Sequence, residues 1–167
     1  MSKKKRTKKY GGRTTMINPL TMFGGMLNHH GGYLVDLQGA THAAMSSLVR
    51  GVGDKSAWDK LVGMNNVGKI LAQRGIGREF LDDFARSGDA LMEMGIRSVE
   101  TGRFVFKGDE LRLLQETMAC HDAQLENIRM IDVELAIREV DRRLLVGQDN
   151  VSVNKEMAVR ETMRKAI

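Results

Sequence analysis

The chain is poor in the residues that build disulfide-linked or many-turned folds. Cys120 is its only cysteine, so an intrachain disulfide is impossible, and such usage is typical of a reducing compartment. One proline and an aromatic content of 5% argue against a β-sandwich. Because no apolar run approaches ~18 residues and no apolar segment follows the basic N-terminus, we expect neither a membrane span nor a signal peptide. We therefore expect a cytoplasmic protein.

Acidic residues are also absent from the start of the chain, and the first one is Asp36. The whole chain has 26 Lys and Arg against 21 Asp and Glu, a net charge of +5. Without its first 13 residues, it would have 19 against 21, a charge of −2. The surplus of positive charge therefore belongs to the N-terminal tail, whose seven cations are Lys3, Lys4, Lys5, Arg6, Lys8, Lys9 and Arg13.

This tail indicates a polyanionic partner. Lys and Arg side chains neutralise phosphates and release counterions, which gives tight, salt-sensitive binding without sequence preference. Tyr10 can stack on a base, and Gly11 and Gly12 allow the tail to follow a groove. We expect the tail to contact DNA or RNA through its seven cations and Tyr10; the alternative is a solubilising tail with no dedicated partner. A membrane surface is disfavoured, since no amphipathic segment or lipidation signal accompanies the tail.

Composition divides the chain into three parts. Residues 1–15 form the basic tail, which we expect to be disordered until it meets a partner. Residues 16–39 are predicted to be an extended Gly-rich apolar arm, with a short strand or turn at residues 33–35, lying across the body or across a neighbouring subunit. Residues 40–167 are predicted to be a helical domain. The expected fold class is all-α, an irregular helical bundle.

Local signals predict where most of the helices begin and end. A short helix over residues 40–50 should stop at Gly51, and Asp54 or Ser56 should cap a second helix that ends near Arg74. A third helix should cover residues 78–99 and end at Gly102, and a last one residues 154–167. Gly68 either weakens the second helix or lets another helix approach closely.

Residues 109–146 contain neither Gly nor Pro, which predicts one very long helix of about 57 Å with Asp109 as its cap. Its apolar stripe changes phase partway along. Leu111 to Ile128 follow one face and Met130 to Leu144 another. Either the helix is kinked or broken near residues 126–130, or its two halves pack against different neighbours. The stripe fills an intrachain core or is shared with another subunit, and we expect the protein to self-associate.

The residues that could carry chemistry do not combine into a site. A zinc site needs four suitably spaced ligands, and neighbouring helical residues such as Cys120 and His121 point apart. For the same reason they do not form a nucleophile and base pair. His121 lies on the apolar stripe, which predicts a core or interface histidine bonded to a carboxylate such as Asp132. Cys120 is predicted to be a small buried residue.

Enzymatic activity is disfavoured by the remaining motifs too. The glycines of residues 51–53 and 75–77 lack the Lys-Ser/Thr of a phosphate-binding loop. Paired carboxylates are typical of solvated helix faces here: Asp82, Asp83, Glu134 and Glu139. We therefore predict no catalytic residue, no metal and no cofactor.

The basic start at residues 2–5 and 8–10 and several short motifs of the body resemble a known group of proteins. These motifs are Trp58, Asn65-Asn66-Val67, Leu71-Ala72, Gly75-Ile76-Gly77, Gly102-Arg103-Phe104, Gly108-Asp109-Glu110-Leu111 and His121-Asp122-Ala123-Gln124-Leu125. Over residues 50–140 and the tail, the chain resembles small, mostly uncharacterised accessory proteins of proteobacterial phages and prophages. The resemblance implies a mobile-element origin and a small helical protein in a bacterial host cell, and it implies no activity.

Two functions follow as hypotheses. The first is a non-enzymatic phage or prophage accessory protein that oligomerises and contacts nucleic acid through its tail. The second is a protein-binding inhibitor of a host complex, such as a defence nuclease or a polymerase, that acts through its helical surface.

Overall fold

The computed structural model describes residues 32–126 and 128–146, and within these residues the protein is all-α without a strand. Its helices are α2 (Gly32–Val49), α3 (Lys55–Gln73), the 3₁₀ turn η1 (Arg78–Phe80), α4 (Leu81–Thr101), α5 (Gly108–Glu126) and α6 (Met130–Val146). The basic tail, residues 16–31 and the helix expected over residues 154–167 lie outside the described residues. None of the described helices combines the length and apolar character that a membrane crossing requires.

Several helix ends follow the predicted local signals. The Asp54 side chain accepts a hydrogen bond from the Ala57 N–H at 3.0 Å and so caps α3. Gly51 and Gly102 have φ angles of 72° and 70° just beyond α2 and α4, in the left-handed region that suits glycine. Asp109 does not cap α5, because it lies within the first turn. Glu110 accepts the Lys107 N–H at 2.8 Å and satisfies the backbone there instead.

The predicted strand or turn at residues 33–35 is wrong, because these residues belong to α2. Residues 32–39, which we assigned to the extended arm, are likewise helical. The stripe Leu34, Leu37, Thr41, Met45 and Leu48 continues with helical spacing through this region, and all but the half-buried Leu34 are buried. Packing of this stripe outweighs the helix-weakening effect of Gly39, which has open space around it.

The very long helix is also wrong, and the alternative of a break is confirmed. Helix α5 ends at Glu126 and α6 begins at Met130, at the point where the apolar stripe changes phase. Among the described helices the longest is α4, with 21 residues. At the start of α6 the Arg129 guanidinium binds the Asp132 carboxylate at 2.8 and 3.0 Å. Each half can then bury its own stripe, which one straight helix could not do.

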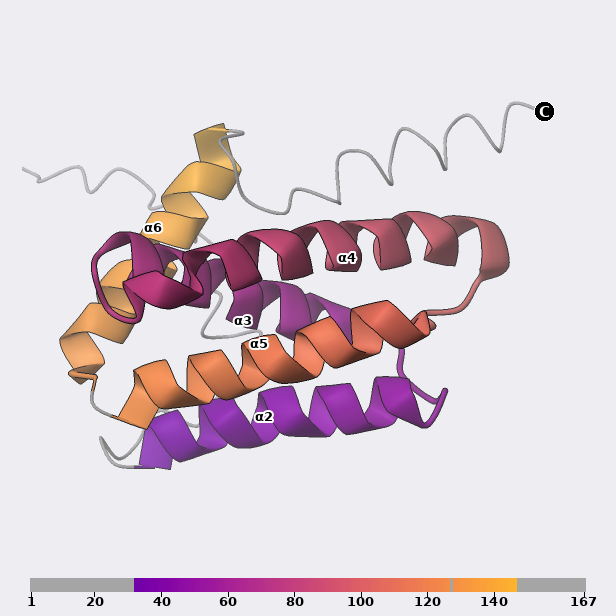
Figure 1. Cartoon of the computed structure of the whole chain (residues 1–167), viewed down its shortest axis with the longest axis horizontal. Helices are drawn as coiled ribbons and strands as arrows, with labels where there is room; N and C mark the ends of the chain where they lie inside the picture. Colours follow the sequence, from indigo (N-terminus) through magenta and orange to yellow (C-terminus); the bar gives the residue numbers. More distant parts are fainter. Residues whose placement is uncertain (1–31, 127, 147–167) are drawn as a thin grey trace, which may run out of the picture.

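Helix α3 is the central element and packs against each of α2, α4, α5 and α6. Figure 1 shows α2, α4 and α5 crossing the view in similar directions, with α6 steeply inclined at one end. The buried apolar side chains form two groups. The Trp58 cluster contains Ala44, Met45, Leu48, Ala57, Trp58, Leu61, Met64, Leu91, Met94, Leu114 and Met118. The Val133 cluster contains Leu37, Val67, Ile70, Leu71, Leu125, Val133, Ala136, Ile137 and Val140.

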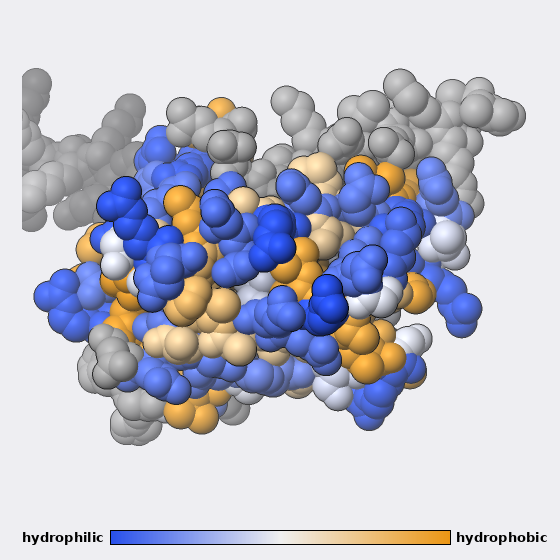
Figure 2. Space-filling view, in the orientation of Figure 1, coloured by the Kyte–Doolittle hydropathy of each residue, from blue (hydrophilic) through white to orange (hydrophobic). Residues whose placement is uncertain are grey.

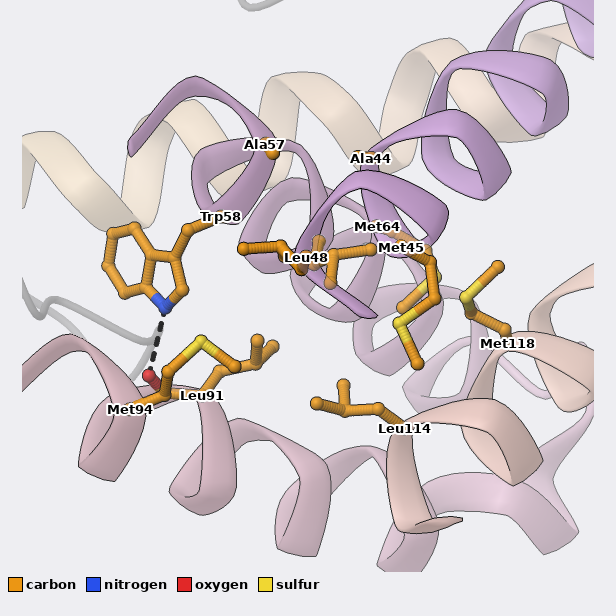
Figure 3. Close-up of a cluster of buried hydrophobic side chains, with 11 residues drawn as sticks. Ala44, Met45, Leu48, Ala57, Trp58, Met64, Leu91, Met94, Leu114 and Met118 are labelled. Carbon is orange, nitrogen blue, oxygen red and sulfur yellow. Dashed lines mark hydrogen bonds between the residues drawn. The ribbon is translucent and has the colours of Figure 1, made fainter. Parts of the chain in front are cut away.

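Trp58 anchors the first cluster. Its indole N–H donates to the Leu91 carbonyl oxygen at 3.0 Å, so the ring is buried without an unpaired donor (Figure 3). The Phe104 ring lies 5.7 Å from the Trp58 ring between their centres. This contact ties the connection between α4 and α5 to the start of α3.

Candidate functional site

The residues predicted to contact nucleic acid all lie in the tail, outside the described residues. The described body differs sharply from that tail in charge. Residues 32–146 contain 15 Lys and Arg against 18 Asp and Glu, a balance of −3. The face in Figure 2 is mainly hydrophilic, with separate apolar areas. The candidate sites of the body are therefore its buried polar groups and its few titratable clusters.

A buried polar layer separates the two apolar clusters along α3, α4 and α5. Its side chains are at most 3% exposed. They are Asn65, Ser87, Thr117, His121 and Gln124. Ser87 donates its hydroxyl to the Asn65 side-chain oxygen and so links α4 to α3.

Gln124 closes this layer. Its Nε2 donates to the Gly68 carbonyl at 3.1 Å and to the Ile76 carbonyl at 2.7 Å. Only the amide nitrogen can donate to two carbonyls, so the Gln124 oxygen faces His121, 3.3 Å from Nδ1. That geometry places the His121 proton on Nδ1. The Gln124 side chain thus links α5 both to α3 and to the α3–η1 connection.

His121 is held in its neutral form. Complete burial lowers the pKa of His121 to about 4, although the Gln124 bond and the charge of Asp122 act in the opposite direction. The Phe84 ring stands edge-on to the imidazole, with 6.4 Å between the ring centres. The prediction of a core histidine is confirmed. The predicted partner Asp132 is wrong, because Gln124 is nearer on α5 and Asp132 is bound to Arg129.

A small cavity adjoins the imidazole. It measures about 40 Å³ and its walls come from α2, α3, α5 and α6. Its lining is apolar except for the His121 imidazole. The lining residues are Leu37, Gly63, Met64, Val67, His121, Ile137 and Val140. A space of this size holds a water molecule or the end of one side chain. Apolar walls and a neutral imidazole favour packing here over proton transfer.

Gly68 permits the close contact between α3 and α4 that the sequence suggested as one of two alternatives. A Cβ atom at this position would overlap the Phe84 ring. Phe84 is fully buried and also meets His121. The close approach therefore supports the polar layer from the α4 side.

Cys120 is half-buried rather than buried, which corrects the prediction. Burial and then the charge of Asp83 raise the pKa of the Cys120 thiol, with further contributions from Glu116 and Glu79. A thiol held protonated is a poor nucleophile. The neighbouring His121 side chain bonds to Gln124 in the core and does not activate it.

An exposed polar cluster joins α2 to α5. The Asp122 carboxylate lies 2.8 Å from His42 Nε2 and accepts a hydrogen bond from the Gln38 amide at 3.1 Å. A nucleophile or a third metal ligand would be needed for chemistry at this pair. Within residues 32–126 and 128–146, His, Cys, Asp and Glu side chains do not gather in threes that could hold a metal ion.

The paired carboxylates lie on the surface of their helices. Asp82 is exposed. Asp83 binds Arg86 at 2.5 Å, and Glu134 lies 3.9 Å from Arg138. Hydrogen bonds from Arg142 and Arg143 lower the pKa of Glu139 to about 2. Asp83, Glu134 and Glu139 thus neutralise arginines of the same helix, as expected of solvated faces.

The sequence did not identify Asn65 and Gln124 as members of a buried layer. Their position in the sequence could have indicated it, because both are polar residues at positions where the helical spacing predicts core residues. Comparison with known proteins adds no further assignment: neither a family model, nor a curated protein, nor a solved structure matches the chain.

Proposed function

We propose that this protein is a non-enzymatic, oligomeric accessory protein of a phage or prophage that contacts DNA or RNA through its basic tail, without strong sequence preference. The observation that supports the proposal is the separation of charge. Seven cations lie within residues 1–13, whereas residues 32–146 carry a balance of −3. A negative body repels a polyanion, so contact depends on the tail.

The described body supports a structural role rather than a catalytic one. Its buried imidazole bonds to Gln124 in the core, and its thiol has a raised pKa. Its helices are held together by apolar clusters and by hydrogen bonds of Ser87 and Gln124 that link neighbouring elements. Such a body presents the tail, and self-association would place several tails on one strand of nucleic acid.

The first experiment replaces the seven tail cations by Gln in the full-length chain. Binding to a labelled oligonucleotide is measured by fluorescence anisotropy between about 50 and 200 mM salt. We expect a log–log salt slope of about −4 to −6 in the wild-type protein and near zero in the Gln variant. The matched control changes the five tail lysines to Arg, which keeps the charge and the slope. Unchanged affinity of the Gln variant at low salt would contradict the proposal.

Tyr10 sharpens the choice between single and double strands. If its ring stacks on a base, Tyr10→Ala weakens binding to a single strand by about 1–3 kcal/mol and leaves the salt slope unchanged. Binding to a duplex, whose bases are already stacked, then changes little. Equal losses on both would contradict a stacking role.

Self-association is tested separately. Size-exclusion chromatography with light scattering, with and without the oligonucleotide, gives the mass of the protein and of its complex. A mass above that of one 18.6 kDa chain supports the oligomer. A monomer that still binds would keep the nucleic-acid contact and remove the oligomer from the proposal.

One observation favours the second candidate, a host-protein inhibitor. Val49, Val52 and Val105 are exposed by 50%, 72% and 54%. Val49 is the last residue of α2, Val52 lies on the α2–α3 connection, and Val105 lies on the α4–α5 connection. Figure 1 places these two connections at the same end of the bundle. Exposed apolar groups near one another are typical of protein-binding surfaces.

The test replaces Val52 and Val105 by Asp in the full-length chain. If a host protein binds this end in stoichiometric amounts without nucleic acid, the double variant should lose it and the Gln tail variant should retain it. The opposite pattern would assign the interaction to the tail.

A further inference from the structure

Helix α4 has a second apolar stripe, which lies to one side of its core-facing residues and reaches the outer side at Ile96. An α-helix turns about 100° per residue, which places Ile96 about 150° from the mean direction of Phe84, Leu91 and Met94. Those three side chains make the contacts with α3 and α5 described above. The second stripe has steps of three and four residues and contains Ala85, Gly88, Met92, Gly95, Ile96 and Val99.

Most of this stripe is shielded from solvent. Ala85 at its start is exposed, but Ile96 is only 9% exposed although it points away from the core, and Met92 and Val99 are half-buried. Figure 1 shows α4 along one edge of the bundle, with α5 on its other side. Gly88 and Gly95 lack side chains and let a neighbouring helix approach closely. A stripe with these properties suits a covering helix.

Charge identifies the kind of helix that would fit. Asp89, Glu93 and Glu100 are exposed and lie within about 60° of Ile96 around the helix axis. They form an acidic flank beside the stripe. A covering helix should therefore have an apolar stripe with basic residues beside it.

We propose that this covering element is the C-terminal segment of the same chain, residues 155–167. The segment contains neither Gly nor Pro. Val159, Met163 and Ala166 repeat the steps of four and three residues that separate Met92, Ile96 and Val99. Its four cations, Lys155, Arg160, Arg164 and Lys165, outnumber its two acids, Glu156 and Glu161, and this surplus of positive charge suits the acidic flank of α4.

Lengths agree with this assignment. Thirteen helical residues extend about 20 Å, and the stripe from Ala85 to Val99 extends about 21 Å. Residues 147–154 connect the segment to the end of α6 and can span up to about 27 Å. Helices α4 and α6 both pack on α3, and packed helices lie about 8–10 Å apart, so the connection is long enough.

Hydrogen exchange on the full-length chain tests whether the segment docks. Met163→Asp places a charge on the proposed apolar face, and Met157→Asp is the matched control on the opposite face of the same helix. We expect residues 155–167 to exchange at least about tenfold faster in Met163→Asp than in the wild-type protein. Met92 should also be oxidised faster. The control should behave like the wild type. Equal effects of the two substitutions, or no protection in the wild type, overturn the proposal.

Cross-linking of the unmodified chain tests where the segment docks and from which copy it comes. A carbodiimide should join Lys155 or Lys165 to Asp89, Glu93 or Glu100. In a mixture of ¹⁴N and ¹⁵N protein, these products should be of a single isotope. Mixed-isotope products would assign the stripe to a second copy, and products with the tail lysines would assign it to the N-terminus. Either result, or no product on α4, overturns the proposal.

Discussion

The Trp58 cluster and the polar layer around His121 are both buried, but they hold the same helices in different ways. The Trp58 cluster is apolar apart from one indole bond to the Leu91 carbonyl. In the polar layer, Gln124 needs the Gly68 and Ile76 carbonyls and the His121 ring in fixed positions. Apolar burial stabilises many compact arrangements, whereas the three hydrogen bonds of Gln124 can form in only one. The first region supplies stability, and the second fixes the register of α5 on α3.

The largest effect is expected from Trp58→Ala, which empties the centre of the apolar region. The unfolding free energy should fall by about 3–5 kcal/mol, since a large buried ring is replaced by a methyl group. Urea unfolding followed by circular dichroism measures it. Trp58→Phe keeps most of the buried ring and should cost clearly less. A small loss for both variants would mean that the polar layer carries more of the stability than we infer.

Next in size is the pH dependence of the polar layer. The pKa of His121 is about 4 in the folded protein and near 6.5 in the unfolded chain, so the unfolded chain takes up a proton first as the pH falls. Stability is complete above pH 6.5 and decreases towards pH 4, by up to about 3 kcal/mol.

Urea unfolding at several pH values measures this loss. The pKa of Glu139 is about 2 in the folded protein and 4.5 in the absence of its partners, so its stabilising effect decreases only below pH 4.5. Data above pH 4.5 therefore avoid this contribution. His121→Gln should flatten the dependence. His42→Gln keeps the buried imidazole and should retain it. A wild-type stability that is flat from pH 6.5 to 4.5 would contradict a neutral buried His121.

The smallest effect concerns the contact that supports the polar layer. Gly68→Ala should cost about 1–3 kcal/mol, because the added methyl group overlaps the Phe84 ring. Gly39→Ala is the matched control in α2, where a Cβ atom meets nothing, and it should stabilise the protein by up to about 1 kcal/mol. Thermal unfolding of both variants measures whether each substitution lowers or raises the stability. A neutral Gly68→Ala would show that α4 can move away from α3.

Some features could be predicted because they depend on residues close in sequence. The Asp54 cap, the ends of α2 and α4 at Gly51 and Gly102, and the burial of His121 on its stripe all follow from local conformation or helical periodicity. The tail's cations were equally visible, and their role remains a proposal.

The sequence by itself determined the all-α class, most helix ends and the concentration of positive charge in the tail. Only the tertiary structure decided that α2 begins at Gly32, that residues 109–146 divide into α5 and α6, and that His121 bonds to Gln124 rather than to a carboxylate. The physical reason is range. Caps and turns are chosen by neighbours within a few residues, whereas these outcomes depend on which distant stripe or carbonyl lies opposite once α3 is surrounded.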